Sequence, residues 1–291
     1  MYIEEKHGNI ILNEVEDFNV EQIFECGQCF HFQKLDDMDY VTVAYGKALR
    51  LTQSLDKVTL HNTDINEYNE IWRKYLDIDT DYGAIKKWLV QRDERLKEAI
   101  DTTYGIRILR QEFHEMLMSF IISQNKQIPH IKQIVSAISE KFGKEAGEIN
   151  GRKYYSFPEV EALNKITEEE YRTLKTGFRA PYLVSASQAL ELGMTAKVLE
   201  IMSYEEAKAE LMKIKGVGDK VASCVLLFGL GYRNAFPVDV WVKRIMEQVY
   251  FHEDTPKEKI MAFAEENFGD YGGYAQQYLF YYARSFLNKV R

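Results

Sequence analysis

Two ionisable side chains in the second half of the sequence have the types and spacing that covalent chemistry needs. Lys220 follows Gly216 and Gly218 at the start of an apolar helical pattern, and Asp239 comes 19 residues later, directly after Pro237 and Val238. The positive end of a helix disfavours an ammonium group, so a lysine in a first turn keeps more of the free amine that a nucleophile requires. Asp239 can cap the next helix and still direct a carboxylate at a reacting centre. Each residue also has a structural explanation, as a solvated lysine and as a helix cap.

The two glycines predict a tight hairpin between two helices. Gly216 and Gly218 flank Val217 and allow the chain to turn through positive φ. A turn of this kind brings backbone amides close to an anion such as phosphate. We therefore expect helices over residues 205–214 and 219–230, joined by a loop that can hold a phosphate.

Length and composition bound the class of protein. The 291 residues, 46% hydrophobic and 28% charged, suit one large globular domain or two modest ones. No run of about 18 apolar residues occurs and the N-terminus lacks an apolar core, so neither a membrane span nor a secretory signal is expected. We expect a compact, prokaryotic and cytoplasmic protein.

The three cysteines suit a reducing compartment. Cys26 and Cys29 have the spacing of a redox or metal pair, but no second pair or group of histidines completes such a site. We favour a buried turn for this pair. Redox or zinc chemistry is the alternative.

A net charge of −8 argues against an extended nucleic-acid footprint. Residues 171–250, however, contain 11 lysines and arginines against 8 aspartates and glutamates, so this segment is positive while the remainder is acidic. Proteins that hold phosphates through backbone amides and helix N-termini need fewer basic side chains. A compact DNA-binding surface is therefore compatible with the acidic total.

The period of the apolar residues divides the chain. From about residue 8 to residue 62 it is two, as at Val41 and Val43, with turns at 45–47 and 54–56, which is typical of antiparallel hairpins. Beyond about residue 66 the period is helical, and Pro129 suits a first turn, so 123–127 joins two helices. Further helices are expected over residues 182–192, 205–214, 219–230, 240–250, 257–268 and 274–288. We predict an α+β protein with a β-rich domain over 1–105, contributing to the site, and a helical domain over 106–291.

Several segments resemble one family. The hairpin with Lys220 and the Pro-Val-Asp run ending at Asp239 resemble the helix-hairpin-helix-GPD superfamily of DNA glycosylases. Residues 104–111, and 118–123 followed by Asn125, resemble its 8-oxoguanine DNA glycosylase branch. The resemblance implies that Lys220 and Asp239 are the catalytic pair and that Asn125 fills the gap left by a flipped nucleotide. Asn125 also has a plainer reading, as the cap of the next helix. The iron–sulfur cluster of some superfamily members needs four cysteines, which this sequence lacks.

The same resemblance assigns four lesion-binding positions. The carbonyl of Gly27 is implied to accept a hydrogen bond from N7–H of 8-oxoguanine, a donor that guanine lacks. Gln276 and Phe280 lie four residues apart, hence on one helix face, and are implied to bind the Watson–Crick edge and to stack on the base. Cys224 is implied to face the second side of the base, either as a thiolate paired with Lys220 or as an inert buried thiol.

The sequence departs from the family pattern at the positions that contact the base opposite the lesion. Phe178 and Arg179 match the aromatic wedge and one of two cytosine-reading arginines, whereas His130 replaces the second arginine. The loss of one bidentate donor is expected to weaken cytosine preference by about 1–3 kcal/mol. A phosphate-binding histidine and its supporting aspartate are absent together, since Trp241 and Ala283 stand there.

The resemblance implies a bifunctional enzyme that flips 8-oxoguanine out of duplex DNA, excises it through a lysine Schiff base and nicks the abasic strand by β-elimination. No cofactor is required, although a structural monovalent or calcium ion is implied at the carbonyls of Met212, Ile214 and Val217. The expected partner is double-stranded DNA containing 8-oxoguanine, bound by a monomer at the nucleoid. The alternatives are a monofunctional alkyl-base DNA glycosylase and a non-catalytic DNA-binding protein built on the same hairpin.

Overall fold

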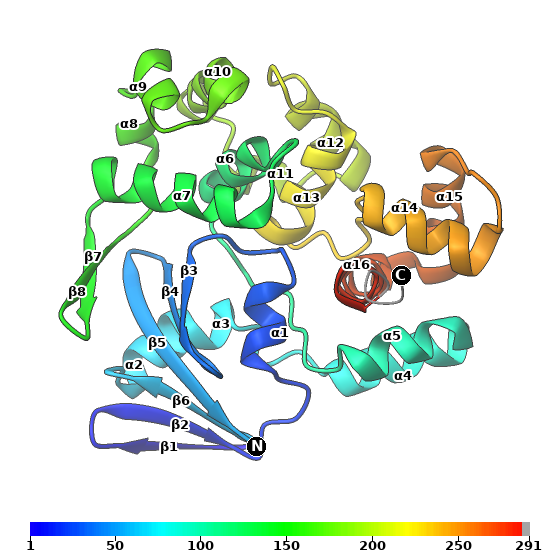
Figure 1. Ribbon diagram of the computed structural model, residues 1–291, viewed down its shortest axis with the longest axis horizontal. Helices are drawn as coiled ribbons and strands as arrows, with labels where there is room; N and C mark the ends of the chain where they lie inside the picture. Colours follow the sequence, from blue (N-terminus) through cyan, green and yellow to red (C-terminus); the bar gives the residue numbers. More distant parts are fainter. Residues whose placement is uncertain (287–291) are drawn as a thin grey trace.

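The computed structural model describes residues 1–286, and its N-terminal part is a six-stranded antiparallel sheet (Figure 1). The strand order is β1-β2-β6-β5-β4-β3. The strands are β1 (Tyr2–Lys6), β2 (Asn9–Asn13), β3 (Phe32–Asp36), β4 (Asp39–Ala44), β5 (Lys47–Ser54) and β6 (Lys57–His61). The turns expected at 45–47 and 54–56 are present, and Tyr45, Gly46 and Leu55 adopt the positive φ values of tight hairpins.

Alternating apolar residues of these strands form one buried face. Leu49 and Leu51 of β5 are fully buried, as are Val58 and Leu60 of β6. This face packs against α1 (Val20–Glu25) and against the helical segment 65–75 that follows β6. That segment is α2 (Ile65–Glu67), the π-helical η1 (Tyr68–Trp72) and α3 (Arg73–Tyr75).

The remainder of the chain is helical and lies over one end of the sheet (Figure 1). Its α-helices are α4 (Tyr82–Arg92), α5 (Lys97–Thr102), α6 (Phe113–Ser123), α7 (Ile128–Phe142), α8 (Val160–Leu163), α9 (Glu168–Thr173), α10 (Ala180–Glu191), α11 (Ala196–Leu199), α12 (Tyr204–Met212), α13 (Asp219–Gly229), α14 (Val240–Met246), α15 (Lys257–Phe268) and α16 (Gly272–Phe286). Short helical turns are η2 (Glu94–Leu96), η3 (Gly177–Arg179), η4 (Glu247–Phe251) and η5 (Gly269–Tyr271). The apolar faces of α6 and α13 pack together at the centre of this helical core.

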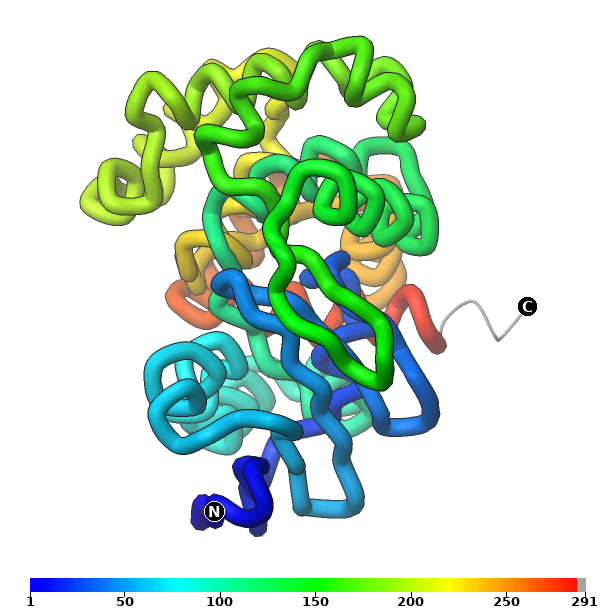
Figure 2. The backbone as a smooth tube through the Cα atoms, turned by 90° about the vertical axis from the view of Figure 1, so that its left-hand side faces the viewer, coloured from blue at the N-terminus to red at the C-terminus, as the bar shows by residue number. Residues whose placement is uncertain are grey.

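A second hairpin, β7 (Glu145–Ile149) and β8 (Arg152–Tyr155), projects from the helical part and lies alongside the N-terminal sheet (Figure 2). Arg152 and Tyr154 both donate to Gln33 of β3, at 2.7 and 3.1 Å. The sequence analysis did not predict this hairpin, because its strands are short and mostly polar.

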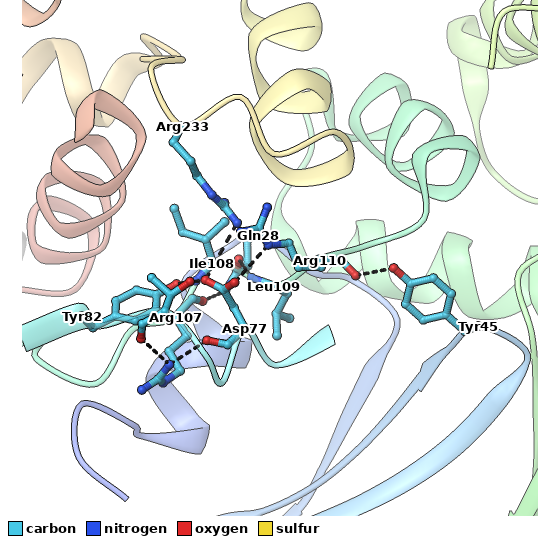
Figure 3. A network of polar contacts seen from close by, with 10 residues as sticks. Gln28, Tyr45, Asp77, Tyr82, Arg107, Ile108, Leu109, Arg110 and Arg233 are labelled. Carbon is cyan, nitrogen blue, oxygen red and sulfur yellow. Dashed lines mark hydrogen bonds and ion pairs between the residues drawn. The ribbon is translucent and has the colours of Figure 1, made fainter. Parts of the chain in front are cut away.

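An extended segment, residues 106–111, joins the sheet to the helices and is held by buried polar groups (Figure 3). Arg107 donates to the carbonyl of Asp77 at 2.8 Å, and the Asp77 carboxylate accepts from Tyr82 at 2.8 Å and from Arg110 at 3.0 Å. Arg233, from the loop before α14, approaches the same carboxylate at 3.9 Å. One buried carboxylate therefore connects three segments that are distant in sequence.

The α+β class predicted from sequence is confirmed, with some differences in boundaries. The first strand begins at Tyr2, ahead of the expected region, and α14 ends at Met246 before a π-helical turn extends it to Phe251. The predicted end of the last helix at residue 288 lies outside the described residues. The domain boundary at 105 stays a prediction; the buried cluster of the helical part already includes residues from Tyr82 onward. Within residues 1–286, no helix has the length and apolar character that crossing a membrane requires.

Candidate active site and DNA interface

The predicted catalytic pair lies in one cavity. A cavity of about 420 Å³ between the sheet domain and the helices is lined by both Lys220 and Asp239. Gly27 and Phe280, two of the predicted lesion-binding residues, line the same cavity. The remaining lining residues are Phe30, Phe120, Ser123, Lys126, Gln127, Ile128, Ile131, Trp241 and Arg284. Apolar walls with a few polar groups of this kind are typical of a ligand site.

Lys220 reaches this cavity from the first turn of α13. Gly218 is the N-cap of that helix, and no side chain caps it, so the first amides of α13 are available to an outside anion. Lys220 is half-buried, and its Nζ lies 5.3 Å from the centroid of the Phe120 ring. The neighbouring Asp219 pairs with Lys208 at 2.6 Å and not with Lys220. Lys220 lines the cavity.

Asp239 is the N-cap of α14. One of its carboxylate oxygens, Oδ1, accepts from the amides of Trp241 and Val242, both at 2.9 Å. The cap explanation and the catalytic explanation are therefore compatible, since the carboxylate has a second oxygen and still lines the cavity. The buried Phe236 and Val238 fix the approach to this cap.

The turn that presents Gly27 is held from several sides. Gly27 has φ +81°, which favours glycine, and Gln277 of α16 donates to the preceding carbonyl of Cys26 at 2.9 Å. The fully buried Gln28 donates to the carbonyl of Arg107 at 2.7 Å and accepts from the amide of Leu109 at 2.9 Å (Figure 3). No hydrogen bond to the Gly27 carbonyl itself occurs among residues 1–286. The turn is thus rigid and its carbonyl is free.

Helix α16 supplies the wall next to this turn. Phe280 lines the cavity, and Gln276, one turn earlier, is 5% exposed with its Oε1 buried and unpaired among the described residues. Arg284, one turn later, was not singled out from sequence. Its Nη2 donates to the carbonyl of Glu25, its guanidinium carbon lies 5.3 Å from the Phe280 ring centroid, and its Nη1 is buried without a partner within the described chain.

The three cysteines are buried free thiols. Burial raises the pKa of Cys26 to about 11 and that of Cys29 to about 12, so the spacing of this pair does not indicate redox chemistry. Burial likewise raises the pKa of Cys224 to about 11, although the nearby Lys220 acts in the opposite direction. Both alternatives for Cys224, a thiolate paired with Lys220 and an inert buried thiol, stay predictions, and burial favours the neutral thiol. Cys224 is 4% exposed and lies one turn after Lys220 in α13.

The predicted DNA-contacting residues lie on the α6–α7 joint, on the first turn of α7 and in η3, which Arg179 connects to that joint. Asn125 is exposed in the α6–α7 joint with φ +49°, which asparagine tolerates. It does not cap α7, because the N-cap is Gln127. His130 is exposed on the first turn of α7, and Phe178 is 51% exposed in η3.

Arg179 differs from the other residues of this edge because it is 4% exposed. Its guanidinium donates to the carbonyls of Gln124 and Thr176. Arg179 thus supports the joint that carries Asn125.

The hairpin between α12 and α13 has one glycine under steric constraint. Gly216 has φ +86°, and a Cβ there would lie 2.3 Å from the Tyr182 ring. The turn through positive φ is made at Gly216 and not at Gly218, which has φ −101° and is extended as the N-cap of α13. A Cβ at Gly218 would meet nothing within 4 Å. Tyr182 also packs edge-on against Phe178, with centroids 6.1 Å apart.

Within the part of the chain that the structure describes, no three His, Cys, Asp or Glu side chains lie close enough to hold a metal ion. The predicted cation site uses the backbone carbonyls of Met212, Ile214 and Val217 instead. The Ile214 carbonyl accepts from the Val217 amide at 3.0 Å and keeps a second lone pair. Such carbonyls are suitable ligands for a hard cation.

Two family descriptions cover most of the chain. Residues 10–117 match "8-oxoguanine DNA glycosylase, N-terminal domain" and residues 118–269 match "HhH-GPD superfamily base excision DNA repair protein". The second match alone spans more than half of the 291 residues. The chain belongs to the HhH-GPD superfamily. The helix-hairpin-helix of this superfamily is α12, the loop through Gly216 and α13.

Relatives and solved structures agree with this membership. The 8-oxoguanine glycosylase/lyase of Clostridium acetobutylicum, in complex with DNA containing 8-oxoguanine opposite cytosine, is 41% identical with a TM-score of 0.94, covering 100% of this chain and 99% of that one. The N-glycosylase/DNA lyase of Saccharomyces cerevisiae is 39% identical over 84% of this chain and 71% of its own length. A probable N-glycosylase/DNA lyase of Methanothermobacter thermautotrophicus is 30% identical over 68% of this chain and 70% of its own length.

Within the HhH-GPD fold, the structure thus brings together four of the predicted site residues and adds others. Lys220, Asp239, Gly27 and Phe280 share the cavity, while Cys224 is buried and is not one of its lining residues. The sequence analysis assigned no role to Gln28, because its anchoring contacts are to a segment some 80 residues away. No sequence signal identified Arg284, because its contacts are to residues some 260 positions away.

Proposed function

We propose that this HhH-GPD protein is a DNA N-glycosylase with AP lyase activity that excises 8-oxoguanine from duplex DNA in base excision repair. The observation that carries the proposal is the single cavity in which an amine, a carboxylate, a free glycine carbonyl and an aromatic ring converge. Two relatives that cover 68% and 84% of this chain are named, respectively, probable N-glycosylase/DNA lyase and N-glycosylase/DNA lyase.

Recognition of the lesion rests on the Gly27 carbonyl. Guanine has an acceptor at N7 and 8-oxoguanine has a donor there, so the carbonyl is paired by the lesion and left unpaired by the normal base. The Phe280 ring lines the same cavity and offers a stacking surface. The unpaired Oε1 of Gln276 suits the N–H donors on the Watson–Crick edge of a guanine.

Catalysis follows from the amine and the carboxylate. The nucleotide is flipped out because C1′ is inaccessible inside the duplex. The free amine of Lys220 forms a bond to C1′ while the C1′–N9 bond breaks, and the base leaves with that electron pair and takes up a proton. Asp239 stabilises the positive charge that develops on the sugar. Ring opening gives the Schiff base, which acidifies the C2′ hydrogen, and loss of that proton expels the 3′ phosphate.

Backbone groups hold the DNA. The free amides at the start of α13, next to the open side of Gly218, are placed to receive a phosphate. Asn125 and Phe178 are exposed where a flipped nucleotide would leave a gap. A monovalent or calcium ion at the carbonyls of Met212, Ile214 and Val217 would stiffen the hairpin, and no chemical step depends on it. The protein acts as a monomer in the cytoplasm, at the nucleoid.

His130 sets the opposite-base preference in this proposal. An exposed histidine offers one donor where a guanidinium would offer two to the opposite cytosine. Base-release rates opposite cytosine and opposite adenine should therefore differ by less than about 10-fold, because a bidentate contact is worth about 1–3 kcal/mol. Single-turnover rates on the two duplexes measure the ratio, and a strong cytosine preference would contradict this role of His130.

One assay separates the proposed activity from its rivals. A labelled duplex with a single 8-oxoguanine is incubated with the enzyme, with and without borohydride. The proposal expects a nicked strand and, with borohydride, a covalent protein–DNA adduct. An alkyl-base glycosylase would leave this duplex intact, would release 3-methyladenine from a duplex that contains that base, and would form no adduct. A DNA-binding protein would release no base from either duplex.

A further inference from the structure

The guanidinium of Arg284 is unusual among the cavity-lining groups because one of its terminal nitrogens is hydrogen-bonded and the other is not. Nη2 donates to the carbonyl of Glu25, the last residue of α1, where a cation is favoured by the helix dipole. Nη1 is buried and has no partner within residues 1–286. A buried charged donor without a partner is costly, so such a group is commonly a place where a ligand acceptor binds.

The free nitrogen lies beside the glycine that faces the lesion. An ideal Cβ on Gly27 would be 3.0 Å from Arg284 Nη1 and 3.0 Å from the Phe280 ring. The guanidinium carbon is 5.3 Å from the centroid of that ring, and Arg284 lines the same cavity as Lys220. One corner of the cavity is therefore formed by Arg284 with its unpaired Nη1, the turn at Gly27 and the Phe280 ring.

We propose that Arg284 is a specificity-determining residue whose Nη1 donates a hydrogen bond to the C8 carbonyl oxygen of the oxidised purine. The inference rests on the proposed function of the cavity. In 8-oxoguanine the N7–H and the C8 carbonyl are adjacent on one edge, as a donor beside an acceptor. The free carbonyl of Gly27 and the free N–H of Arg284 form the complementary acceptor and donor. Guanine, with an acceptor at N7 and only C–H at C8, satisfies neither.

The anchored half of the fork explains why an arginine suits this position. One planar guanidinium offers one nitrogen to the Glu25 carbonyl and another to the lesion in a fixed geometry, whereas an ammonium has a single nitrogen on a flexible stem. The Glu25 contact also keeps the guanidinium against Phe280, so the donor is in place before the base arrives. Preorganised donors of this kind discriminate between ligands because little is lost on ordering them.

Binding measurements in a Lys220→Gln background, where the lesion stays intact, test this assignment. The second change is Arg284→Met, and the matched control is Arg73→Met, which removes an exposed arginine of α3 paired with Asp79. The duplexes contain 8-oxoguanine, an abasic tetrahydrofuran site, or an 8-oxoguanine analogue in which a methylene replaces N7–H. The last ligand keeps the C8 oxygen and removes the contact to Gly27.

Arg284→Met is expected to weaken binding to the 8-oxoguanine duplex by about 10- to 100-fold, the range for a hydrogen bond to a charged donor. Affinity for the tetrahydrofuran duplex should stay within about 3-fold, and the loss should persist with the methylene analogue. An equal loss on the tetrahydrofuran duplex would overturn the proposal, since Arg284 would then act on the backbone or on folding. A loss that vanishes with the methylene analogue would also overturn it, because Arg284 would then act only through Gly27.

Arg284→Lys provides a second variant with the charge retained. The lysine variant should lose most of the same lesion selectivity, since its single nitrogen on a flexible stem lacks the two fixed donor positions of the guanidinium; full selectivity in this variant would contradict the proposal. Nicking by the protein with all these residues intact is scored separately. If that protein fails to nick the 8-oxoguanine duplex, the proposed function fails, whereas unchanged selectivity in the variants of a nicking enzyme refutes the role of Arg284 alone.

Discussion

Lys220 enters the cavity from the N-terminal turn of α13, with the Phe120 ring on one side and the buried Cys224 one turn later on the same helix. Replacing Lys220 with glutamine should abolish base release and borohydride trapping, because the amide is not a nucleophile. Lesion binding should change little, since a glutamine side chain at position 220 still lines the cavity. Gel-based nicking, trapping and fluorescence anisotropy measure the three properties.

An exposed lysine such as Lys257 of α15 supplies the control. Its replacement with glutamine should leave all three properties intact. An adduct that survives Lys220→Gln would show that another amine attacks the sugar.

Asp239 performs two tasks that one substitution can separate. Asparagine caps a helix about as well as aspartate, so Asp239→Asn should unfold at nearly the same urea concentration. It should lose at least about 100-fold in single-turnover rate, because the charge that stabilises the sugar cation is gone. Equal losses in rate and in DNA affinity would reduce Asp239 to a cap.

At the scale of single residues, the sequence predicted the reactive and lesion-binding side chains but not the residues that hold them in place. Lys220, Asp239, Gly27 and Phe280 were identified from residue type and family pattern, and the structure places them around one cavity. The roles themselves stay predictions. Gln28 and Arg284 act through contacts with distant segments, which neither spacing nor periodicity can reveal.

The hairpin between α12 and α13 distinguishes its two glycines. Gly216→Ala should destabilise the protein by more than about 2 kcal/mol, because alanine is strained at positive φ and its Cβ would overlap the Tyr182 ring. Gly218→Ala should cost less than about 1 kcal/mol in stability, since the site is extended and open. Urea denaturation measures both.

DNA affinity gives the complementary readout. If Gly218 lies against a phosphate, Gly218→Ala should weaken binding to an abasic-site duplex although the protein is stably folded. A Gly218→Ala protein with unaltered affinity would show that the phosphate binds elsewhere.

Helices and long strands were predictable because one face of each is apolar at a regular period. The order from α6 to α7 through 123–127, with Pro129 in the first turn, is confirmed. The β7–β8 hairpin was missed because it is stabilised by contacts to β3, not by its own burial pattern. The cap at Asn125 was wrong because Gln127 already occupies the extended position before α7.

At the scale of the whole molecule, one buried carboxylate links segments that are distant in sequence. Asp77 is 7% exposed and accepts from Tyr82 and Arg110 while Arg233 approaches from the helical part. Asp77→Ala removes the buried carboxylate from the half-buried Arg110 and Arg233 and should cost about 3 kcal/mol in the free energy of unfolding. Equilibrium urea denaturation followed by fluorescence measures the loss.

Asp79 is the matched comparison because it lies two residues away and pairs with Arg73 on the surface. Asp79→Ala should cost less than about 1 kcal/mol, since exposed pairs contribute little. Similar losses in the two variants would mean that the junction in Figure 3 does not couple the sheet to the helices.

The burial of all three sulfur atoms bears on the conditions in which the enzyme works. Peroxide reacts with thiolates, and Cys26, Cys29 and Cys224 are sequestered from solvent and stay protonated at neutral pH. The oxidants that create damaged guanines should therefore leave these side chains chemically unaltered. A repair catalyst built this way keeps its capacity when cellular stress is greatest and demand for it rises.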